Sequence, residues 1–437
     1  MRKIKLLIKK LLPDIIVKII KDPLFYRKQK KLLFEIESVR SKQETALGAV
    51  KQKEYVNVAF LVMHHSIWKY EKVFKLFERD KRYKTSVVII PLVRDGKADM
   101  ENYFKTLNYF RNRNYETVET FNMQENSWLD VKVLLNLDVV FFTNPHKITY
   151  DIYYIDNFLD KLTCYVPYSF QVANAYESHF NKPFHLKIWK QFYETEFHKK
   201  LAAKYSLING ENVVVTGYPI VDYVYDEDIN LEDPWPSKDP ALKRIIWAPH
   251  HTIEGFGEGL DYSTFLNYSN KILQYAKVHS DKLQMAFKPH PLLREKLYKR
   301  ADWGKEKTDE FYMEWELLDT TILQEGEYIA LFKFSDALLH DCGSFSAEYL
   351  LFNKPVMFLV ANEKSLNNFN DFGKECIARH YIGYSWTVIE LFLDSIINSK
   401  QDLLANNRRE FVKQNCLPPN NKSAAENIFK YLKKQLD

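Results

Sequence analysis

A cation and an imidazole stand together in the loop Lys288-Pro289-His290-Pro291, after an apolar run that begins at Leu283. The two prolines restrict the backbone on either side of the histidine and so aim its ring. Lysine and histidine both donate N–H groups, and lysine adds a positive charge, which suits a phosphate group. We therefore expect Lys288 to bind a diphosphate and His290 to act as a catalytic residue.

Two pairs of adjacent histidines also follow apolar runs. His250 and His251 stand in the second half of the chain, and His64 and His65 follow Val56–Met63 near its start. Successive side chains on extended backbone point in opposite directions, so we expect one ring of each pair to face a ligand. Histidine has an unperturbed pKa of about 6.5, which suits a general base. We predict catalytic roles for His250 and for His64 or His65. His251 is predicted to contact a bound nucleotide.

A polar turn between an apolar strand and a helix-like segment is a second phosphate-binding feature. The strand Ala337-Leu338-Leu339 runs into the turn His340-Asp341-Cys342-Gly343-Ser344, and a further strand follows Lys354-Pro355. Gly343 allows close approach of a ligand, Ser344 or Ser346 is suited to cap the helix, and a helix N-terminus attracts anions. The amides of residues 343–346, Phe345 included, are therefore predicted to hold the diphosphate together with His340.

Two acidic residues flank this turn. Asp341 is expected either to hold an imidazole in one tautomer or to support the loop. Glu348 lies one turn into the helix and is expected either to contact a ribose hydroxyl or to be an exposed helix charge. Cys342 is interpreted as a small residue that fills a tight turn.

Apolar runs alternate with helical patterns along the whole chain, which predicts an α/β fold with parallel sheets. The acidic, proline-bearing segment 226–242 is interpreted as a linker between two Rossmann-like halves that face a cleft. We predict a helical extension over residues 1–50, an acceptor domain over 51–225, a nucleotide-donor domain over 240–400 and C-terminal helices over 401–437. Ligands of such sheets bind beyond the carboxyl ends of the strands, where all of the loops above lie.

The first residues of the chain are strongly basic. Residues 1–31 hold eleven Lys or Arg and two Asp, a net charge of +9, so the rest of the +5 chain sums to −4. Apolar residues at 4, 7, 11, 15 and 19 share one helical face, although Pro13 interrupts the pattern. This predicts a helix on the anionic inner leaflet of a membrane; the alternatives are a helix packed on the protein and a mobile lead-in. Nucleic acid is not expected as a partner, because the remainder is slightly acidic.

Other classes of site have little support in the sequence. Four scattered cysteines form neither a zinc motif nor a disulfide framework, and they suggest a reducing cytosol. Signatures such as GxxxxGK[ST], GxGxxG, HExxH and GxSxG are missing from the sequence. We therefore expect neither a metal nor a separate cofactor, and no stretch approaches the roughly 20 apolar residues of a spanning helix.

The ordered set of motifs over residues 130–400 resembles the CDP-glycerol glycerophosphotransferases of teichoic acid and capsule synthesis. The matching blocks are Trp247-Ala248-Pro249-His250-His251, Lys288-Pro289-His290-Pro291, the segment from Ser335 to Ser344, Lys354-Pro355-Val356 and Val215-Thr216-Gly217-Tyr218-Pro219. The resemblance implies a GT-B fold and a CDP-activated donor.

One block of that family has no histidine here. The family commonly carries Trp-His-Gly-Thr-Pro in the N-terminal half, where this chain has Tyr165-Val166-Pro167-Tyr168-Ser169-Phe170-Gln171. We expect Tyr168 and Gln171 to lie on the acceptor side. Three explanations of the missing histidine stay open: His64 or His65 acts as the general base, Tyr168 only positions the acceptor, or the chemistry differs.

The resulting hypothesis is a cytoplasmic transferase, peripheral on the inner face of the bacterial plasma membrane. It would move glycerol phosphate or a related polyol phosphate from the CDP-activated donor to a hydroxyl of a lipid-linked or growing cell-surface glycan, releasing CMP. One alternative is a GT-B glycosyltransferase that uses a nucleotide sugar in capsule or lipopolysaccharide synthesis. Another is a binding module without catalysis.

Overall fold

The computed structural model describes residues 23–225, 229, 231–253 and 262–437. Its contacts divide the chain into two compact units. Unit 1 comprises residues up to Tyr168, Ala175–Asp222 and Pro418–Asp437, and unit 2 comprises Ser169–Asn174 and Tyr223–Leu417. The predicted amphipathic face over residues 4–19 lies outside the described residues.

Unit 1 is built on a parallel sheet with seven strands in the described part of the chain, in the order β11-β10-β9-β8-β1-β2-β5. Its strands are β1 (Val56–Val62), β2 (Tyr83–Ile89), β5 (Thr117–Glu119), β8 (Val139–Phe142), β9 (Leu162–Tyr165), β10 (Lys190–Tyr193) and β11 (Val213–Val215). The chain moves outward in one direction from β1 to β5 and in the other from β8 to β11. The strand order therefore reverses between β1 and β8, and His64 follows β1 at that switch point.

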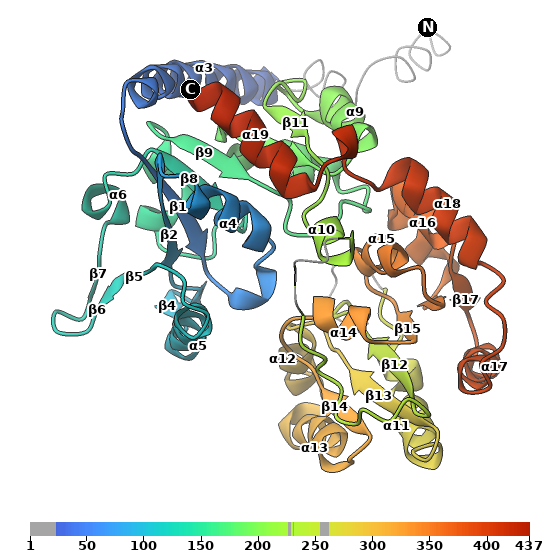
Figure 1. Cartoon of the computed structure of the whole chain (residues 1–437). Coiled ribbons are helices and arrows are strands. Elements are labelled where there is room, and N and C mark those ends of the chain that lie inside the picture. The colour runs from blue at the N-terminus through green and yellow to red at the C-terminus, as the bar shows by residue number, and fades with distance from the viewer. Residues whose placement is uncertain (1–22, 226–228, 230, 254–261) are drawn as a thin grey trace, which may run out of the picture. The chain divides into compact units, whose positions relative to one another are not determined.

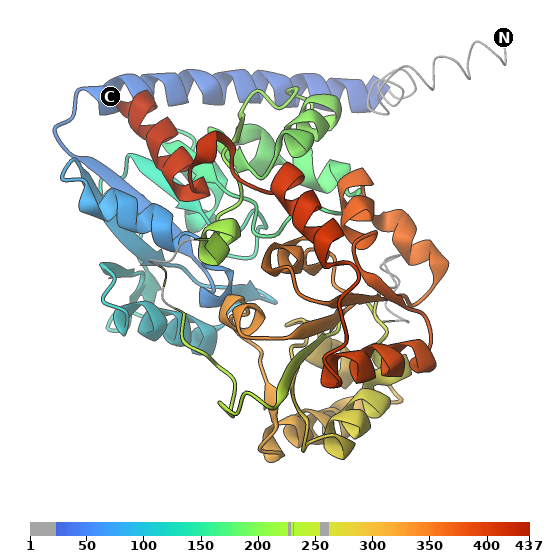
Figure 2. The same cartoon turned by 45° about the vertical axis from the view of Figure 1, so that its right-hand side comes forward.

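The helices of unit 1 cover this sheet, and the last helix of the chain is one of them. They are α3 (Pro23–Lys51), α4 (Glu71–Arg79), α5 (Met100–Arg111), α6 (Val131–Leu134), α7 (Tyr176–Phe180), α8 (Pro183–Lys187), α9 (Glu196–Tyr205) and α19 (Ala424–Leu436). The helix α10 (Ile220–Tyr225) begins in unit 1 and ends in unit 2. Figures 1 and 2 both show α19 beside α3, and α19 also packs on α4. The Asp222 carboxylate accepts the N–H groups of Ala424 and Ala425 at 2.8 and 2.9 Å, which fixes the start of α19.

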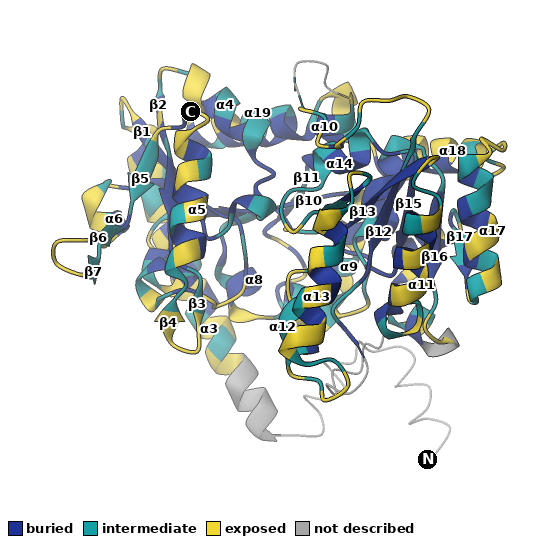
Figure 3. Ribbon diagram, turned by 90° about the horizontal axis from the view of Figure 1, so that it is seen from below, coloured by how far each residue is buried: buried dark blue, intermediate teal, exposed yellow. Residues whose placement is uncertain are grey.

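Unit 2 contains a parallel sheet of six strands among the described residues, in the order β14-β13-β12-β15-β16-β17. The strands are β12 (Lys243–Ala248), β13 (Leu283–Phe287), β14 (Thr321–Leu323), β15 (Ala337–His340), β16 (Val356–Leu359) and β17 (Tyr381–Gly383). Figure 3 shows β12, β13 and β15 in the colour of buried residues. This is the Rossmann order, and its switch point lies between β12 and β15.

Helices and an aromatic core complete unit 2. The helices are α11 (Phe265–Val278), α12 (Leu293–Tyr298), α13 (Gly304–Leu317), α14 (Ile329–Lys333), α15 (Phe345–Glu348), α16 (Asp371–Ile377), α17 (Trp386–Ile397) and α18 (Ala405–Asn415). Trp247 of β12 is fully buried, and its ring stacks on Phe287 and Phe265 with centroids 4.9 and 5.7 Å apart. Stacked aromatic rings of this kind bury much apolar area. They therefore fix the ends of β12 and β13 relative to each other, and with them the loops that follow.

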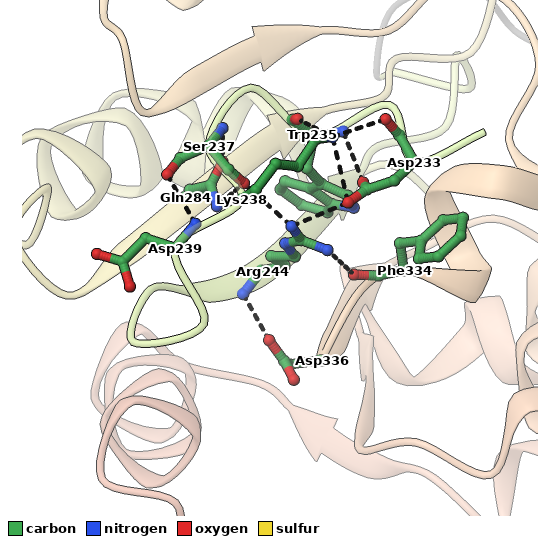
Figure 4. Close-up of polar contacts among 9 residues, drawn as sticks. All are labelled: Asp233, Trp235, Ser237, Lys238, Asp239, Arg244, Gln284, Phe334 and Asp336. Carbon is green, nitrogen blue, oxygen red and sulfur yellow. Dashed lines mark hydrogen bonds and ion pairs between the residues drawn. The ribbon is translucent and has the colours of Figure 1, made fainter.

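The segment interpreted as a linker is anchored to unit 2 over most of its described part. Arg244 of β12 forms an ion pair with Asp233 at 3.0 Å and donates to the Ser237 carbonyl at 3.0 Å, and Trp235 is 1% exposed. The Arg244 N–H also donates to Asp336 at 2.8 Å, which joins the starts of β12 and β15 (Figure 4). The linker interpretation is therefore wrong for residues 231–242, which clamp the strands that carry the site loops.

Two other expectations need adjustment. The aromatic and charged residues of the stretch 175–206 have a pattern that predicts helix throughout, but the stretch contains the largely buried strand β10. Residues from Pro418 onward pack in unit 1, although residues 401–437 were expected to form a separate helical segment. Among the described residues, no helix is both long and apolar enough to cross a membrane.

Candidate functional site

The loops after β12, β13 and β15 meet at the switch point of unit 2. The N–H of Lys288 donates to the Trp247 carbonyl at 2.8 Å, and the N–H of His290 donates to the Pro249 carbonyl at 3.1 Å. These bonds continue the β12–β13 ladder beyond the strands. They bring the Lys-Pro-His-Pro loop beside the histidine pair, as their positions after neighbouring strands predict.

Three imidazole rings cluster at this edge of the sheet. The ring centroid of His290 lies 5.0 Å from that of His250 and 4.2 Å from that of His251, and the paired rings are 4.4 Å apart. Burial and the neighbouring rings lower the pKa of His250 to about 3 and that of His290 well below its usual value. The rings of His250 and His290 are therefore neutral at physiological pH.

Backbone hydrogen bonds determine which nitrogen of two of these rings carries the proton. The N–H of Leu292 donates to Nδ1 of His290 at 3.1 Å, and the N–H of Thr252 donates to Nδ1 of His250 at 3.3 Å. A nitrogen that accepts cannot also carry a proton, so the neutral rings hold theirs on Nε2. Both rings thus offer Nε2–H donors rather than lone pairs.

The same cluster has the spacing of a metal site. One ligand atom from each of His250, His251 and His290 lies within 4.8 Å of the others. A histidine that binds a metal almost always donates its other N–H to an acceptor, whereas Nδ1 of His250 and of His290 receives a backbone N–H. The arrangement therefore fits an oxyanion better than a cation.

Lys288 adds a positive charge next to the rings. Its side chain is buried, and it has no ion-pair partner in the part of the chain that the structure describes. Burial lowers the pKa of Lys288 to about 8, with Cys342 and Glu325 opposing the shift. A desolvated ammonium without a carboxylate is a strong attraction for an anionic ligand.

Asp341 supports the loop from below. Its carboxylate accepts the His250 N–H at 2.5 Å and both the N–H and the hydroxyl of Thr264, at 2.6 and 2.8 Å. Burial raises the pKa of Asp341 to about 7, although these hydrogen bonds oppose the shift. Of the two roles expected for Asp341, the structure favours support of the loop. Its carboxylate accepts a hydrogen bond from the His250 backbone N–H and not from an imidazole.

The turn after β15 differs from its prediction in detail. Ser344 occupies the N-cap position without a side-chain hydrogen bond, and the Ser346 hydroxyl donates to the Gly343 carbonyl, so neither side chain caps α15. The Ser346 N–H also donates to Gly343, at 3.1 Å. Among the described residues, the amides of Gly343, Ser344 and Phe345 have no hydrogen-bond acceptor, so they stay available to an anion.

Two residues of the turn itself have structural roles. His340 is fully buried and donates its Nδ1–H to the Cys342 carbonyl at 3.0 Å, so we reassign it from ligand binding to shaping the turn. The Cys342 thiol donates to the Ala248 carbonyl at 3.3 Å, and burial raises its pKa well above the usual value, as expected for a structural cysteine.

Glu348 is not the exposed helix charge that was one of its expected roles. It is fully buried, and its carboxylate accepts the Phe170 N–H at 3.3 Å and the Tyr328 hydroxyl at 2.6 Å. The partner Tyr328 was missed because a lone tyrosine twenty positions upstream of its acceptor gives no local signal. These bonds tie the segment Ser169–Asn174 to unit 2.

In unit 1, His64 and His65 follow β1 as predicted, but their environments differ. The Ser66 N–H donates to Nδ1 of His64 at 3.1 Å, which again places the proton of the neutral ring on Nε2. His65 is buried and stacks on Tyr109 at 4.9 Å, and burial lowers its pKa to about 4. His64 is thus a hydrogen-bond donor, and the geometry of neither ring favours a general base.

The two residues expected on the acceptor side fall in different units. Tyr168 is part of unit 1, where its backbone N–H donates to the Tyr165 hydroxyl at 3.1 Å, whereas Gln171 is part of unit 2 and is buried. Sequence reasoning missed Lys69, a buried lysine whose ammonium donates to the Tyr168 carbonyl and, at 2.5 Å, to the Tyr218 hydroxyl. A single lysine in a loop has no pattern that would have revealed it.

Two Rossmann-like units with parallel sheets and ligand loops at a switch point define a protein of the GT-B fold class. A solved structure of a variant of the wall teichoic acid polymerase TagF is similar, with a TM-score of 0.56 and 14% identity, and 97% of each chain is covered. A structure of MnaA with UDP from S. aureus has a TM-score of 0.51 and 18% identity, and covers 88% of this chain and 97% of its own. Both support the predicted fold.

The profile of the CDP-Glycerol:Poly(glycerophosphate) glycerophosphotransferase family matches residues 190–434, more than half of the chain. The protein belongs to this family, as the motifs predicted. The teichoic acid ribitol-phosphate polymerase TarK of Staphylococcus aureus (strain NCTC 8325 / PS 47) is 27% identical over 171 residues. That match covers 38% of this chain and 30% of the relative, so the aligned part is about a third of the relative's length.

Proposed function

We propose that the protein transfers glycerol phosphate or a related polyol phosphate from a CDP-activated donor to a hydroxyl of a lipid-linked or growing cell-surface glycan. Family membership supports the donor class. The observation that carries the proposal is the convergence of His250, His290 and Lys288 at the switch point of unit 2. Two neutral Nε2–H donors, and one ammonium without an ion-pair partner among the described residues, are suited to a diphosphate.

These groups contribute to catalysis by electrostatic stabilisation of charge. The acceptor hydroxyl attacks the β-phosphorus, the new P–O bond forms, and the bond to the CMP oxygen breaks with its electron pair leaving on CMP. Lys288, the histidine donors and the amides of residues 343–345 stabilise the negative charge that builds on the diphosphate. The His250 and His290 rings remain donors throughout, so the hydroxyl proton is taken by another group.

The identity of the polyol is a second part of the proposal. The name of the TarK relative, a ribitol-phosphate polymerase, supports including CDP-ribitol beside CDP-glycerol as a candidate donor. We also propose that the protein works in the cytoplasm at the inner face of the membrane. The net charge of +9 over residues 1–31 supports attraction to anionic lipids.

The test is CMP release by the full-length chain, with CDP-glycerol or CDP-ribitol and a lipid-linked acceptor. We expect acceptor-dependent CMP and expect stabilisation against heating by the CDP donors rather than by UDP-sugars. Stabilisation by a UDP-sugar alone would favour the glycosyltransferase alternative. Binding of no nucleotide at all would favour a module without catalysis.

A further inference from the structure

The transfer reaction leaves one group without a residue, the base that takes the proton of the acceptor hydroxyl. Nδ1 of His64, of His250 and of His290 receives a backbone N–H, so these three donor histidines offer protons rather than lone pairs. His65 is buried. A general base must combine a lone pair with access for the substrate. Another histidine of unit 1 meets both conditions.

His146 lies in the loop that follows β8, at the carboxyl edge of the unit 1 sheet. β8 is hydrogen-bonded to β1, and the switch point of this sheet lies between these two strands. The Thr143 hydroxyl donates to the Leu61 carbonyl at 2.8 Å, and the Tyr154 hydroxyl donates to the Pro145 carbonyl at 3.2 Å. These bonds hold the loop in place, so the ring of His146 stands on a fixed backbone where ligands of such sheets bind.

The backbone around His146 leaves a lone pair on its ring. At the three donor histidines the N–H of residue i+2 donates to Nδ1, whereas here that N–H, from Ile148, donates to the His146 carbonyl at 2.9 Å. The His146 N–H donates to the Asn144 side chain at 2.8 Å. Within the described part of the chain, Nδ1 of His146 has no hydrogen-bond partner. The neutral ring can therefore carry its proton on Nδ1, toward water, and keep the lone pair on Nε2.

The lone-pair nitrogen of His146 faces a tyrosine. Nε2 lies 3.4 Å from the hydroxyl of Tyr168, and the two ring centroids are 5.6 Å apart. Both residues are exposed, Tyr168 by 37%, so a substrate hydroxyl can reach them. The Tyr168 backbone is held by the Tyr165 hydroxyl and by the ammonium of Lys69. The contact between the rings is longer than a typical hydrogen bond, and catalytic hydrogen bonds often tighten only when the substrate is bound.

The surroundings of His146 keep its ring neutral. Although the residue is exposed, desolvation of the ring, and after it the charge of Lys182, lower the pKa of His146 from its usual value. His179 of α7 is a second imidazole in this neighbourhood, and burial lowers its pKa to about 4, with His146 adding to the shift. Both rings are therefore neutral at physiological pH, and a neutral ring is the form that accepts a proton.

We propose that Nε2 of His146 is the general base of the transfer and that Tyr168 positions the acceptor. The acceptor oxygen forms its bond to the β-phosphorus while CMP leaves with the electron pair of the broken P–O bond. The hydroxyl proton moves to Nε2, so the ring becomes an imidazolium and then returns a proton to water. This assignment rests on the transferase function proposed above and adds to it the residue that activates the acceptor.

The experiment measures CMP release by the full-length protein with CDP-glycerol or CDP-ribitol and the lipid-linked acceptor. The glutamine of His146→Gln is polar but cannot take a proton, so kcat should fall by roughly 10²–10⁴. The Kd for CDP should stay that of the parent, because the groups expected to hold the diphosphate belong to unit 2. His179→Gln removes the neighbouring imidazole and is the matched control, with a kcat close to that of the parent.

Two further measurements distinguish a base from a structural residue. In the parent, kcat should rise with pH through a pKa below about 6.5, since a protonated ring cannot accept a proton. His146→Gln should lose this dependence, whereas a rise due to Asp341, whose pKa is about 7, would remain. Added imidazole should restore part of the rate to His146→Ala but not to Tyr168→Phe, which should mainly raise KM.

The possible outcomes separate this assignment from the transferase function. If the parent is active and His146→Gln has the same kcat, His146 is not the base. The assignment is also overturned if imidazole does not restore His146→Ala although that variant binds CDP and unfolds like the parent. A parent that releases no acceptor-dependent CMP would overturn the transferase function, and the role of His146 with it.

Discussion

The N–H of Leu292 donates to Nδ1 of His290 at 3.1 Å, and this one bond determines what the ring can do. With Nδ1 occupied as an acceptor, the neutral imidazole carries its proton on Nε2. Thr252 does the same for His250 and Ser66 for His64. In all three cases the backbone N–H of residue i+2 donates to Nδ1 of the histidine at position i. The three rings, each near the end of a strand, are therefore hydrogen-bond donors through Nε2.

If His290 donates a hydrogen bond to the diphosphate, a side chain with a donor in the same place should partly replace it. We expect His290→Ala to lower the rate of CMP release by roughly 10²–10³, the usual cost of losing one such donor. His290→Gln, whose amide donates N–H, should recover part of that loss. A general base would instead be lost equally in both variants, so equal rates for Gln and Ala would contradict the donor role.

Lys288 should make nucleotide affinity sensitive to alkaline pH. Its pKa is lowered to about 8 by burial, so the positive charge is present below that pH and is lost as pH rises through it. We expect the Kd for CDP to increase between pH 7 and pH 9 in the parent protein. Lys288→Met should bind CDP weakly and with little pH dependence, and calorimetry at both pH values measures the difference. A parent affinity that stays constant over this range would show that Lys288 does not contact the ligand.

The hydroxyl of Thr264 should stabilise the folded protein mainly when Asp341 is ionised. Thr264→Val removes the 2.8 Å bond to the carboxylate and should cost about 1.5–3 kcal/mol of unfolding free energy above pH 7. Asp341 has a pKa of about 7, so the loss should shrink as pH falls and the carboxyl becomes neutral.

The matched control for this swap is Thr308→Val in α13. The Thr308 hydroxyl donates to the neutral Gly304 carbonyl at 2.6 Å, and its removal should cost about 1 kcal/mol at every pH. Denaturant unfolding at pH 6 and pH 8 distinguishes the two variants. If the loss of unfolding free energy depends on pH equally in both variants, ionisation of Asp341 does not strengthen its hydrogen bond with Thr264.

The positions of the site loops could be predicted, because each follows an apolar run of strand length. Val56–Met63 and the run from Leu283 alternate with helical patterns, which is enough to indicate parallel sheets and to place His64 and His290 at their carboxyl ends. The strand β10 was missed since Lys190–Tyr193 has charged and aromatic neighbours that resemble a helix face.

What could not be predicted depends on contacts between distant residues. The capping box of Ser423 and Glu426 marks the start of α19 locally. The contact of its first N–H groups with Asp222, about two hundred positions away, has no local signal. The tautomer of His290 depends on a backbone N–H of a loop whose path the sequence does not give. His340 looked like a ligand residue because it precedes a glycine turn, but burial turns its ring inward.

Acid should destabilise unit 1 through its buried histidines. His185 donates Nδ1–H to the Gln191 side chain at 2.9 Å, and burial lowers its pKa to about 4. A histidine whose folded pKa is depressed stabilises the folded state above its unfolded pKa of about 6.5, and this stability is lost as pH falls toward 4. The loss from one such residue is at most roughly 3.5 kcal/mol.

His185→Asn keeps a side-chain donor near Gln191 but cannot be protonated in this range. We therefore expect the variant to lose less unfolding free energy than the parent between pH 6.5 and pH 4, even if it is less stable at pH 7.5. His279→Asn, at the half-exposed end of α11, is the control for removing a histidine in unit 2. Urea unfolding across this range measures all three proteins. The assignment fails if His185→Asn and His279→Asn follow the parent curve equally, because acid sensitivity would then arise elsewhere in the chain.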